Sequence, residues 1–186
     1  ILSMALVLAN RFVRLHDETE QLNESLSRFN AASRRFVPFE FLNMLDKKSI
    51  LDVNLGDQVQ RNMAVLFSDI RSFTALSEKM TPKENFDFIN SYLDKVGPVI
   101  RDHKGFIDKY IGDAVMALFP ESAADALEAA LGMHDRVRRW NERRAVHGYA
   151  AVAIGIGVHE GRVMLGTIGE HARMDGTVIA DAVNLA

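Results

Sequence analysis

Residues 105–120 read GFIDKYIGDAVMALFP, in which two apolar segments meet at Gly112. This pattern predicts a β-hairpin, because strand-like segments separated by a glycine favour a tight turn. A hairpin alone does not account for Lys109 and Asp113, which lie four residues apart around the bend. These two charged residues are therefore candidates for a functional role.

The segments on either side of the hairpin predict an α+β domain. A buried strand precedes it over residues 63–70, and a long helix follows that strand, with Thr81 as its N-cap and Pro82 at its first position. A second long helix begins after Ser122 and ends near Gly148. The stretches AVAIGIGVHEG and RVMLGTIG predict two further strands. The order β-α-β-β-α-β is that of a ferredoxin-like split βαβ sheet with helices on one face.

Residues 1–34 predict a helix that pairs with another helix, since no proline precedes Pro38 and no glycine precedes Gly56. One heptad position is apolar throughout and its companion is mixed. They are occupied by Leu8, Leu15, Leu22, Phe29 and Phe36, and by Ala5, Phe12, Thr19, Leu26 and Ser33. The narrow seam favours a parallel dimeric coiled coil over an amphipathic helix docked on its own domain. Residues 35–61 then form a junction, and residues 62–186 form the compact domain.

The first nine residues, ILSMALVLA, are apolar, but Asn10 and Arg11 interrupt the run. A membrane-spanning helix needs roughly 20 apolar residues, so this segment is too short to span a bilayer alone. Two interpretations stay open. The segment is either the inner end of a membrane helix that starts outside this chain, or the top of a helix in water.

Composition describes a globular protein of one domain and an appendage. The chain has 186 residues, of which 48% are hydrophobic and 25% are charged. A net charge of -3 argues against a nucleic-acid partner, because phosphate backbones bind basic surfaces. The lack of cysteine excludes disulfides and thiolate zinc sites, and it is compatible with a reducing cytosol.

Two carboxylates are predicted to meet at one edge of the sheet. Asp69 ends the first strand, and Asp113 lies in the bend of the hairpin that a split βαβ sheet places beside that strand. Taken singly, Asp69 reads as an N-cap and Asp113 as a turn residue. Taken together they suit Mg²⁺, which binds hard oxygen ligands together with substrate phosphates. The amides of the following IRSFT segment would hold phosphates in the same corner.

Four ordered motifs carry a resemblance to a known family. VLFSDIRSFT, KYIGDAVMALF, GIGVHEGRVMLGTIG and MDGTVIADAVNLA resemble the successive signatures of class III nucleotide cyclases, the adenylyl and guanylyl cyclase catalytic domain. The resemblance runs from about residue 62 to the last residue. It implies two Mg²⁺ or Mn²⁺ ions bound by Asp69, Asp113 and the Ile70 carbonyl. It also implies main-chain amides at Phe73 and Thr74 that cradle the triphosphate.

The same resemblance implies the groups that recognise the rest of the nucleotide. Lys109 would hydrogen-bond the adenine ring, Thr177 would read the same base edge, Arg162 would meet phosphate, and Asn184 would orient the ribose. Guanylyl cyclases typically carry Glu and Cys in place of Lys109 and Thr177. The resemblance therefore implies a bacterial-type adenylyl cyclase that converts ATP to 3′,5′-cyclic AMP and pyrophosphate. In the family the active site lies between two protomers, so Lys109 and Asp113 would serve different sites of one homodimer.

The sequence departs from the family pattern in four places. The family often has Tyr, Gly and Thr where Gly176, Ala180 and Ala182 stand, and these positions flank the segment that reads the base. The family's transition-state arginine follows Asn184 by four residues, whereas the sequence above ends two residues after it. The expectation is therefore that these 186 residues are a fragment with very low activity by itself.

The predicted coiled coil indicates regulation by an upstream sensor, either membrane-bound or not. The expected location is a cytoplasmic catalytic domain, with the C-terminal part of a bacterial inner-membrane receptor as one setting. Three other interpretations account for the sequence less well. The key residues present argue against a catalytically silent cyclase-like dimerisation module, whereas the missing arginine position leaves it open. A diguanylate cyclase needs a Gly-Gly-acidic-acidic-Phe hairpin, which KYIGDAV is not. A coiled-coil scaffold without chemistry leaves Asp69 and Asp113 unexplained.

Overall fold

The computed structural model describes residues 2–33, 37–170 and 172–186, and the side chains from residue 11 onward within these ranges. The chain divides into two units, Ile1–Phe39 and Glu40–Ala186. The first unit contains one long helix, α1 (Leu2–Ser33), which agrees with the helix predicted over these residues. Within the described residues, no helix combines the length and the apolar character that crossing a bilayer requires.

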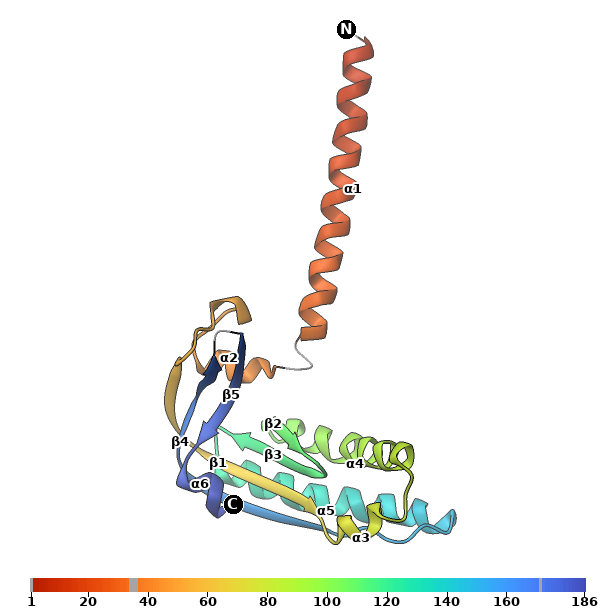
Figure 1. Cartoon of the computed structure of the whole chain (residues 1–186), viewed down its shortest axis with the longest axis vertical. Helices are drawn as coiled ribbons and strands as arrows, with labels where there is room; N and C mark the ends of the chain where they lie inside the picture. Colours follow the sequence, from red (N-terminus) through yellow and green to blue (C-terminus); the bar gives the residue numbers. More distant parts are fainter. Residues whose placement is uncertain (1, 34–36, 171) are drawn as a thin grey trace. The chain divides into compact units, whose positions relative to one another are not determined.

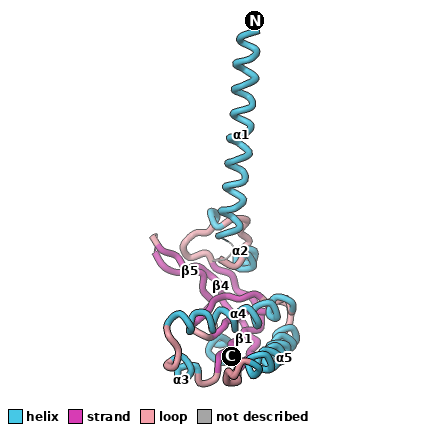
Figure 2. Tube along the Cα trace, turned by 90° about the vertical axis from the view of Figure 1, so that its right-hand side faces the viewer, coloured by secondary structure: helices cyan, strands magenta, loops and turns pink. Residues whose placement is uncertain are grey.

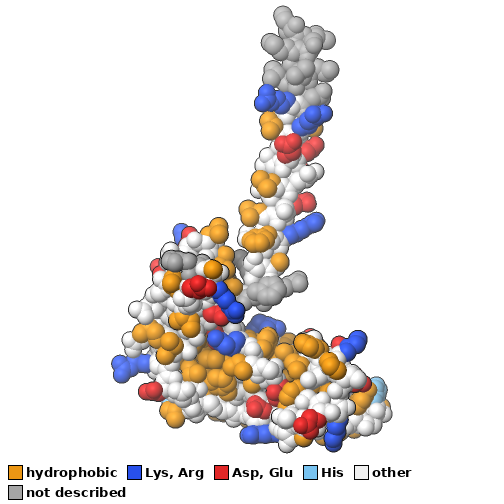
Figure 3. Space-filling view, viewed as in Figure 1, with side chains coloured by type: hydrophobic (Ala, Val, Ile, Leu, Met, Phe, Trp, Pro, Cys, Tyr) orange, Lys and Arg blue, Asp and Glu red, His pale blue; other side chains and the backbone are white. Residues whose placement is uncertain are grey.

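Apolar side chains lie exposed along α1. Leu15, Leu22 and Phe29 of the apolar heptad position are exposed, as are Phe12 and Leu26 of its companion (Figure 3). The side chains of Leu8 and Phe36, which belong to the same predicted seam, lie outside the described residues. The pairing of α1 with a second helix stays a prediction.

The second unit combines a five-stranded sheet with helices, which agrees with the predicted mixture of α and β elements. The strands are β1 (Gln58–Ile70), β2 (Phe106–Ile111), β3 (Ala114–Phe119), β4 (Ile154–Glu170) and β5 (Arg173–Ile179). Their order in the sheet is β2-β3-β1-β4-β5, and each neighbouring pair is antiparallel (Figure 1). The predicted hairpin is present as β2 and β3, and it lies directly beside β1.

The prediction of two strands over residues 151–169 is wrong, because β4 runs unbroken through this region. Its first part pairs with β1 as far as Gly166, and its last part pairs with β5 from Met164 onward. A hydrogen-bonding partner is therefore present along its whole length, and Gly161 stays in the ladder opposite Met63. Beyond its pairing with β1, β4 continues with β5 as an arm that projects from the sheet (Figure 2).

Two long helices cover one face of the sheet. The first, α4 (Pro82–Asp102), begins as predicted, with the Thr81 side chain accepting from Glu84 N while the Glu84 side chain accepts from Thr81 N. The second, α5 (Ala123–Val146), is capped by Ser122, whose hydroxyl accepts from Ala124 N. Their apolar sides pack on Ala64, Leu66 and Ile70 of β1. The core on this side also contains Tyr92, Ile100, Met133 and Trp140.

The two long helices lie on one face, as predicted, but the other face also carries helices, which was not predicted. Met63 and Val65 alternate with Ala64 and Leu66 along β1, and both sets are buried. A strand that is apolar on both faces needs cover on both. The second face is covered by α2 (Phe39–Met44) through Phe41 and by α6 (Asp181–Leu185) through Ala182. The remaining short elements are a 3₁₀ turn, Ile50–Asp52, and α3, Phe73–Ser77.

Candidate active site

Two carboxylates meet at the end of β1. Asp69 is exposed near the last residue of that strand, and Asp113 follows Gly112 at the tip of the β2–β3 hairpin. Gly112 has φ +64°, a left-handed conformation that suits glycine. Asp113 Oδ2 accepts a hydrogen bond from Ile70 N at 3.1 Å. This bond holds Asp113 against the residue that follows Asp69, so the structure brings both predicted carboxylates to one corner.

A buried tyrosine supports this corner from the helix side. Tyr92 of α4 is fully buried, and its hydroxyl lies 3.0 Å from Ser68 Oγ, one residue before Asp69. Burial raises the pKa of Tyr92 to about 12, and the hydrogen bond with Ser68 opposes the shift. The negative charges of Asp113 and Asp69 also contribute to this rise in the pKa of Tyr92, because a phenolate beside two carboxylates is unfavourable. Tyr92 is therefore a neutral hydrogen-bonding partner of β1.

Replacing Tyr92 with phenylalanine is expected to change the pH dependence of stability. A folded-state pKa of about 12, above the ordinary 10, means that the neutral form stabilises the fold below pH 10 and that this advantage is lost as pH rises toward 12. At pH 8, wild type should be more stable than Tyr92→Phe by about 1 kcal/mol, the contribution of one hydrogen bond. At pH 11 the titration removes about 1.4 kcal/mol from wild type alone, so the difference should vanish or reverse.

The measurement is urea unfolding from pH 8 to 11, followed by the fluorescence of Trp140, the sole tryptophan of the chain. Its ring lies 6.5 Å from that of Tyr92, so its emission reports on this part of the core. A difference between wild type and Tyr92→Phe that stayed constant over this range would contradict the assignment.

The chemistry of the corner fits a divalent cation that is shared with a substrate. Asp69, Asp113 and the Ile70 carbonyl are hard oxygen donors, as Mg²⁺ and Mn²⁺ require. Within the described residues, no group of three or more His, Cys, Asp or Glu side chains is placed to hold a metal. Two carboxylates suit Mg²⁺ because this ion usually keeps waters and substrate phosphates as its other ligands. The donor set here is consistent with the divalent metals that the resemblance implies.

The predicted phosphate-binding residues follow directly after this corner. Phe73 and Thr74 open α3, after Ser72 in a left-handed conformation with φ +57°. Thr74 is exposed, whereas Phe73 is half-buried and stacks on Phe88 of α4. The aromatic contact holds the start of α3 against α4. The binding of phosphate by these amides stays a prediction.

Lys109 and Thr177 are brought together although they come from opposite edges of the sheet. Lys109 Nζ lies 3.4 Å from the carbonyl oxygen of Gly176, the residue before Thr177. Since β2 and β5 are the two edge strands, this contact requires the sheet to curl. The resemblance implied that Lys109 and Thr177 meet at one base edge, whereas the contact of Lys109 with the Gly176 carbonyl was not predicted. Gly176 also packs against the ring of Phe41, which fills the space that a side chain at this position would need.

Arg162 and Asn184 lie apart from the corner formed by Asp69 and Asp113, and neither takes part in the contact of Lys109 with Gly176. Arg162 is exposed on β4 opposite Asn62, which is seven residues from Asp69, or about 23 Å measured along the strand. Asn184 is exposed on α6. This helix lies close over β4, with Ala182 beside Gly161. The structure therefore places neither residue within contact of the carboxylate corner of its own chain.

Sequence reasoning missed three residues that support the candidate site. Tyr92 and Phe41 gave no signal, because each reads as an ordinary core residue in an apolar pattern. Asp108 gave a signal that was not used. It is an acidic residue inside an apolar strand, directly before Lys109, and its side chain is buried.

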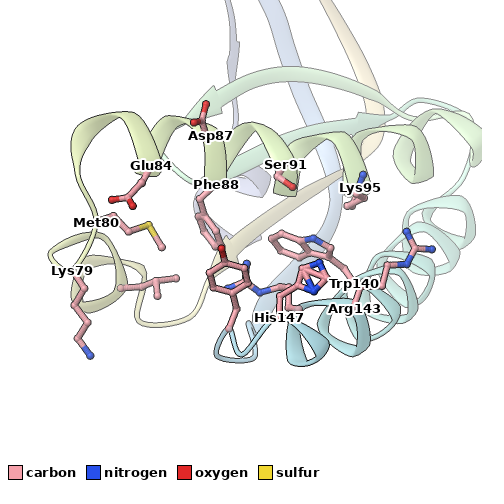
Figure 4. Close-up of a pocket in the computed structure, with 13 residues that line it drawn as sticks. Lys79, Met80, Glu84, Asp87, Phe88, Ser91, Lys95, Trp140, Arg143 and His147 are labelled. Atoms are coloured by element: carbon pink, nitrogen blue, oxygen red, sulfur yellow. The ribbon is translucent and has the colours of Figure 1, made fainter.

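A cavity of about 670 Å³ lies between α4 and α5, and none of the predicted site residues lines it (Figure 4). Its aromatic side is organised by Arg144, whose guanidinium carbon lies 4.8 Å from the Trp140 ring centre and 5.2 Å from that of Phe88. The same side chain donates to the carbonyl oxygen of Ala150. These contacts tie the end of α5 to the loop before β4, so they account for Arg144 structurally.

Comparisons with known proteins agree on one family. The family described as the adenylate and guanylate cyclase catalytic domain matches residues 56–186. A protein of Anabaena cylindrica named adenylate cyclase is 44% identical over 157 residues, covering 82% of this chain and 31% of that protein. The chain spans less than a third of the length of the first curated relatives that it matches.

Solved structures similar to this chain include two cyclases. The adenylyl cyclase CyaB from P. aeruginosa is 30% identical with a TM-score of 0.65, over 69% of this chain and 70% of that one. The guanylyl cyclase Cya2 is 32% identical with a TM-score of 0.62, over 71% of this chain and 69% of that one. Both kinds of cyclase thus share this fold.

Proposed function

The chain belongs to the family of adenylate and guanylate cyclase catalytic domains, and from this premise we propose that it converts ATP to 3′,5′-cyclic AMP and pyrophosphate. Membership confirms the resemblance drawn from the four sequence motifs. The observation that carries the proposed reaction is the hydrogen bond between Asp113 Oδ2 and Ile70 N, which places a second carboxylate beside Asp69. Two acidic side chains at one strand end suit the binding of a nucleoside triphosphate with its metal ions.

Lys109 and Thr177 support ATP as the substrate rather than GTP. An ammonium group only donates hydrogen bonds, so it pairs with the N1 acceptor of adenine and not with the N1–H of guanine. Thr177 adds a hydroxyl that both donates and accepts, one residue from the carbonyl that Lys109 contacts. A site built from such groups rejects the other purine because a donor is left facing a donor.

The proposed reaction is an in-line displacement within one ATP molecule. The 3′-oxygen forms a bond to the α-phosphorus, the bond to the pyrophosphate oxygen breaks, and the 3′-hydroxyl proton is released. Asp69, Asp113 and the Ile70 carbonyl would hold the cations, while the Phe73 and Thr74 amides would position the phosphates. Two Mg²⁺ or Mn²⁺ ions, when bound, neutralise phosphate charge and acidify the 3′-hydroxyl. The protein contributes mainly by positioning.

A site shared by two copies of the chain accounts for the separation of these groups. The Lys109 ammonium contacts Gly176 and Asp108 of its own chain, and neither contact involves Asp69 or Asp113. Arg162 lies about 23 Å from Asp69 along β1. In the proposed homodimer, one protomer supplies the carboxylates and the other supplies Lys109 and Thr177. Arg162 would neutralise phosphate charge and Asn184 would orient the ribose.

We further propose that α1 pairs with its copy as a parallel coiled coil and sets the register of the dimer. Its exposed apolar seam supports pairing. The segment that precedes β1 supports a route to the site, because Thr167 N donates to Asp57 O and Thr167 Oγ1 donates to Asn54 O. Thr167 directly follows Gly166, the cross-strand partner of Thr177. An upstream sensor, membrane-bound or not, would then act through α1 on a cytoplasmic catalytic domain.

Removing residues 1–34 from the full-length protein tests this regulatory role. We expect weaker dimerisation by sedimentation equilibrium and lower cyclase activity at low protein concentration, because each active site needs two copies. Activity should recover as protein concentration rises. Unchanged dimer affinity together with unchanged activity would contradict the coiled coil.

The reaction itself is tested by giving the full-length protein ATP or GTP, with Mg²⁺ or with Mn²⁺, and quantifying cyclic nucleotide and pyrophosphate. Cyclic AMP and pyrophosphate should form in equal amounts, with ATP preferred over GTP by at least about tenfold. Cyclic GMP as the main product would contradict the substrate assignment. Absence of any cyclic nucleotide with both metals would contradict the reaction.

A further inference from the structure

The hairpin strand that carries Lys109 contains a β-bulge at Asp108. Ile107 pairs with Ala117 and Lys109 pairs with Met116, so two steps along β2 match one step along β3. Asp108 is the extra residue. A bulge of this kind redirects the side chains that follow it, and it is often found beside functional sites.

The bulge decides which face of the sheet Lys109 occupies. Ile107 and Ala117 belong to the face that α4 and α5 cover, whereas Met116 belongs to the face that α2 and α6 cover. Side chains normally alternate along a strand, so a regular strand would place Lys109 on the same face as Ile107. With the extra residue, Lys109 shares the face of Met116, from which its ammonium reaches Gly176 O at 3.4 Å.

Asp108 is the ionic partner of Lys109. Its side chain is only 4% exposed, and its Oδ2 lies 3.5 Å from Lys109 Nζ. Within the described part of the chain this oxygen makes no hydrogen bond, so the ammonium is its compensating contact. Burial raises the pKa of the Asp108 carboxyl, and the charge of Lys109 opposes that shift. A buried carboxylate is stable only when it is paired, so Asp108 and Lys109 hold each other in place.

The other contact of the ammonium is fixed as well. Gly176 lies against the ring of Phe41, a residue of α2 that is itself buried against the sheet. The ring limits movement of the Gly176 carbonyl toward α2. Lys109 Nζ thus lies between the buried carboxylate of Asp108 and the carbonyl oxygen of Gly176, the residue before Thr177.

We propose that Asp108 is a positioning residue that sets the place of the Lys109 ammonium for recognition of the purine base. The inference rests on the proposed function and deepens it, because it assigns base selectivity to a residue that does not itself touch the nucleotide. Asp108 acts in two ways: its extra position in the strand turns Lys109 to the correct face, and its charge holds the ammonium beside Gly176 and Thr177.

The test is a double-mutant cycle in the full-length protein with Asp108→Asn, Lys109→Ala and the double variant. Asparagine keeps the size and position of the bulged side chain but removes its charge. We expect Asp108→Asn to raise the KM for ATP about 5- to 10-fold with kcat changed less than about twofold, because base contacts act equally on ground and transition states. The preference for ATP over GTP should fall in parallel. In the Lys109→Ala background the same substitution should have no further effect.

Asp94→Asn is the matched control, because Asp94 also precedes a lysine and forms an ion pair with it at 2.7 Å. Asp94 is exposed on α4, so its loss should leave the KM and the ATP preference unchanged. Equal effects of Asp108→Asn in the presence and absence of Lys109 would overturn the proposal, since they indicate a general structural role. A fall in kcat with unchanged KM would also overturn it.

Binding of an ATP analogue with a methylene group between its α- and β-phosphates, which cannot release pyrophosphate, is measured by calorimetry and separates this inference from the proposed reaction. If wild type binds the analogue but forms no cyclic nucleotide, the reaction is wrong and the same cycle is read on the Kd. An increase in Kd with Asp108→Asn that disappears without Lys109 would then support the positioning role, and an unchanged Kd would overturn it. Failure of wild type to bind the analogue overturns both.

Discussion

Replacing Asp69 with asparagine is expected to lower the kcat for cyclic AMP formation by at least about 100-fold. Removing one strong electrostatic stabiliser of a transition state costs about 2.7 kcal/mol or more, which corresponds to this factor. Asp69 is exposed at the end of β1, so the loss should come from metal and phosphate binding and not from unfolding. Asp113→Asn should have an effect of similar size, because the asparagine can still accept from Ile70 N but has lost its charge.

Asp87→Asn serves as the control for both variants. Asp87 is an exposed carboxylate on α4 whose contact is an ion pair with Lys83, four residues before it. Surface pairs of this type contribute little, so activity should stay within about twofold of wild type. The dimer should remain intact by sedimentation for all three variants. Turnover of Asp69→Asn close to that of wild type, measured in the full-length protein, would refute the role of this corner.

Mixing two variants, each nearly inactive at an ATP concentration far below its KM, is expected to restore activity at that concentration. One variant carries Asp69→Asn, and the other carries Lys109→Ala with Thr177→Ala. If each active site takes its carboxylates from one copy and its base-recognising groups from the other, a heterodimer has one intact site and one doubly damaged site. Equal mixing with free exchange gives half heterodimers, so about a quarter of the wild-type activity should return.

Co-expression with two different affinity tags allows heterodimers to be purified and assayed directly, and these should show about half of the wild-type activity because one of their two sites is intact. A mixture of Asp69→Asn with Asp113→Asn is the control, because both substitutions damage the same half of the site and no activity should return. Recovery in the control, or no recovery in the first mixture despite heterodimer formation, would contradict a site shared between two copies.

The sequence predicted those parts of the molecule that depend on local contacts. Thr81 and Ser122 cap their helices because a side chain and an amide two or three residues away suffice for a cap. The hairpin around Gly112 is equally local. Its position beside β1 followed from the order of the elements, and that order predicted that Asp69 and Asp113 lie close together. The four motifs also identified the family.

Tertiary structure alone decided what depends on pairing between distant segments. The continuity of β4 through Gly161 follows from partners supplied by β1 and β5, and the cover of the second face by α2 and α6 follows from packing. The bulge at Asp108 is a shift in register against β3, so it depends on how the two strands pair and cannot be located from the sequence of β2 alone. The contact of Lys109 with Gly176 joins opposite edges of a curled sheet. Register and curl arise from many non-local contacts at once, and for this physical reason the sequence could name Lys109 but not its partners.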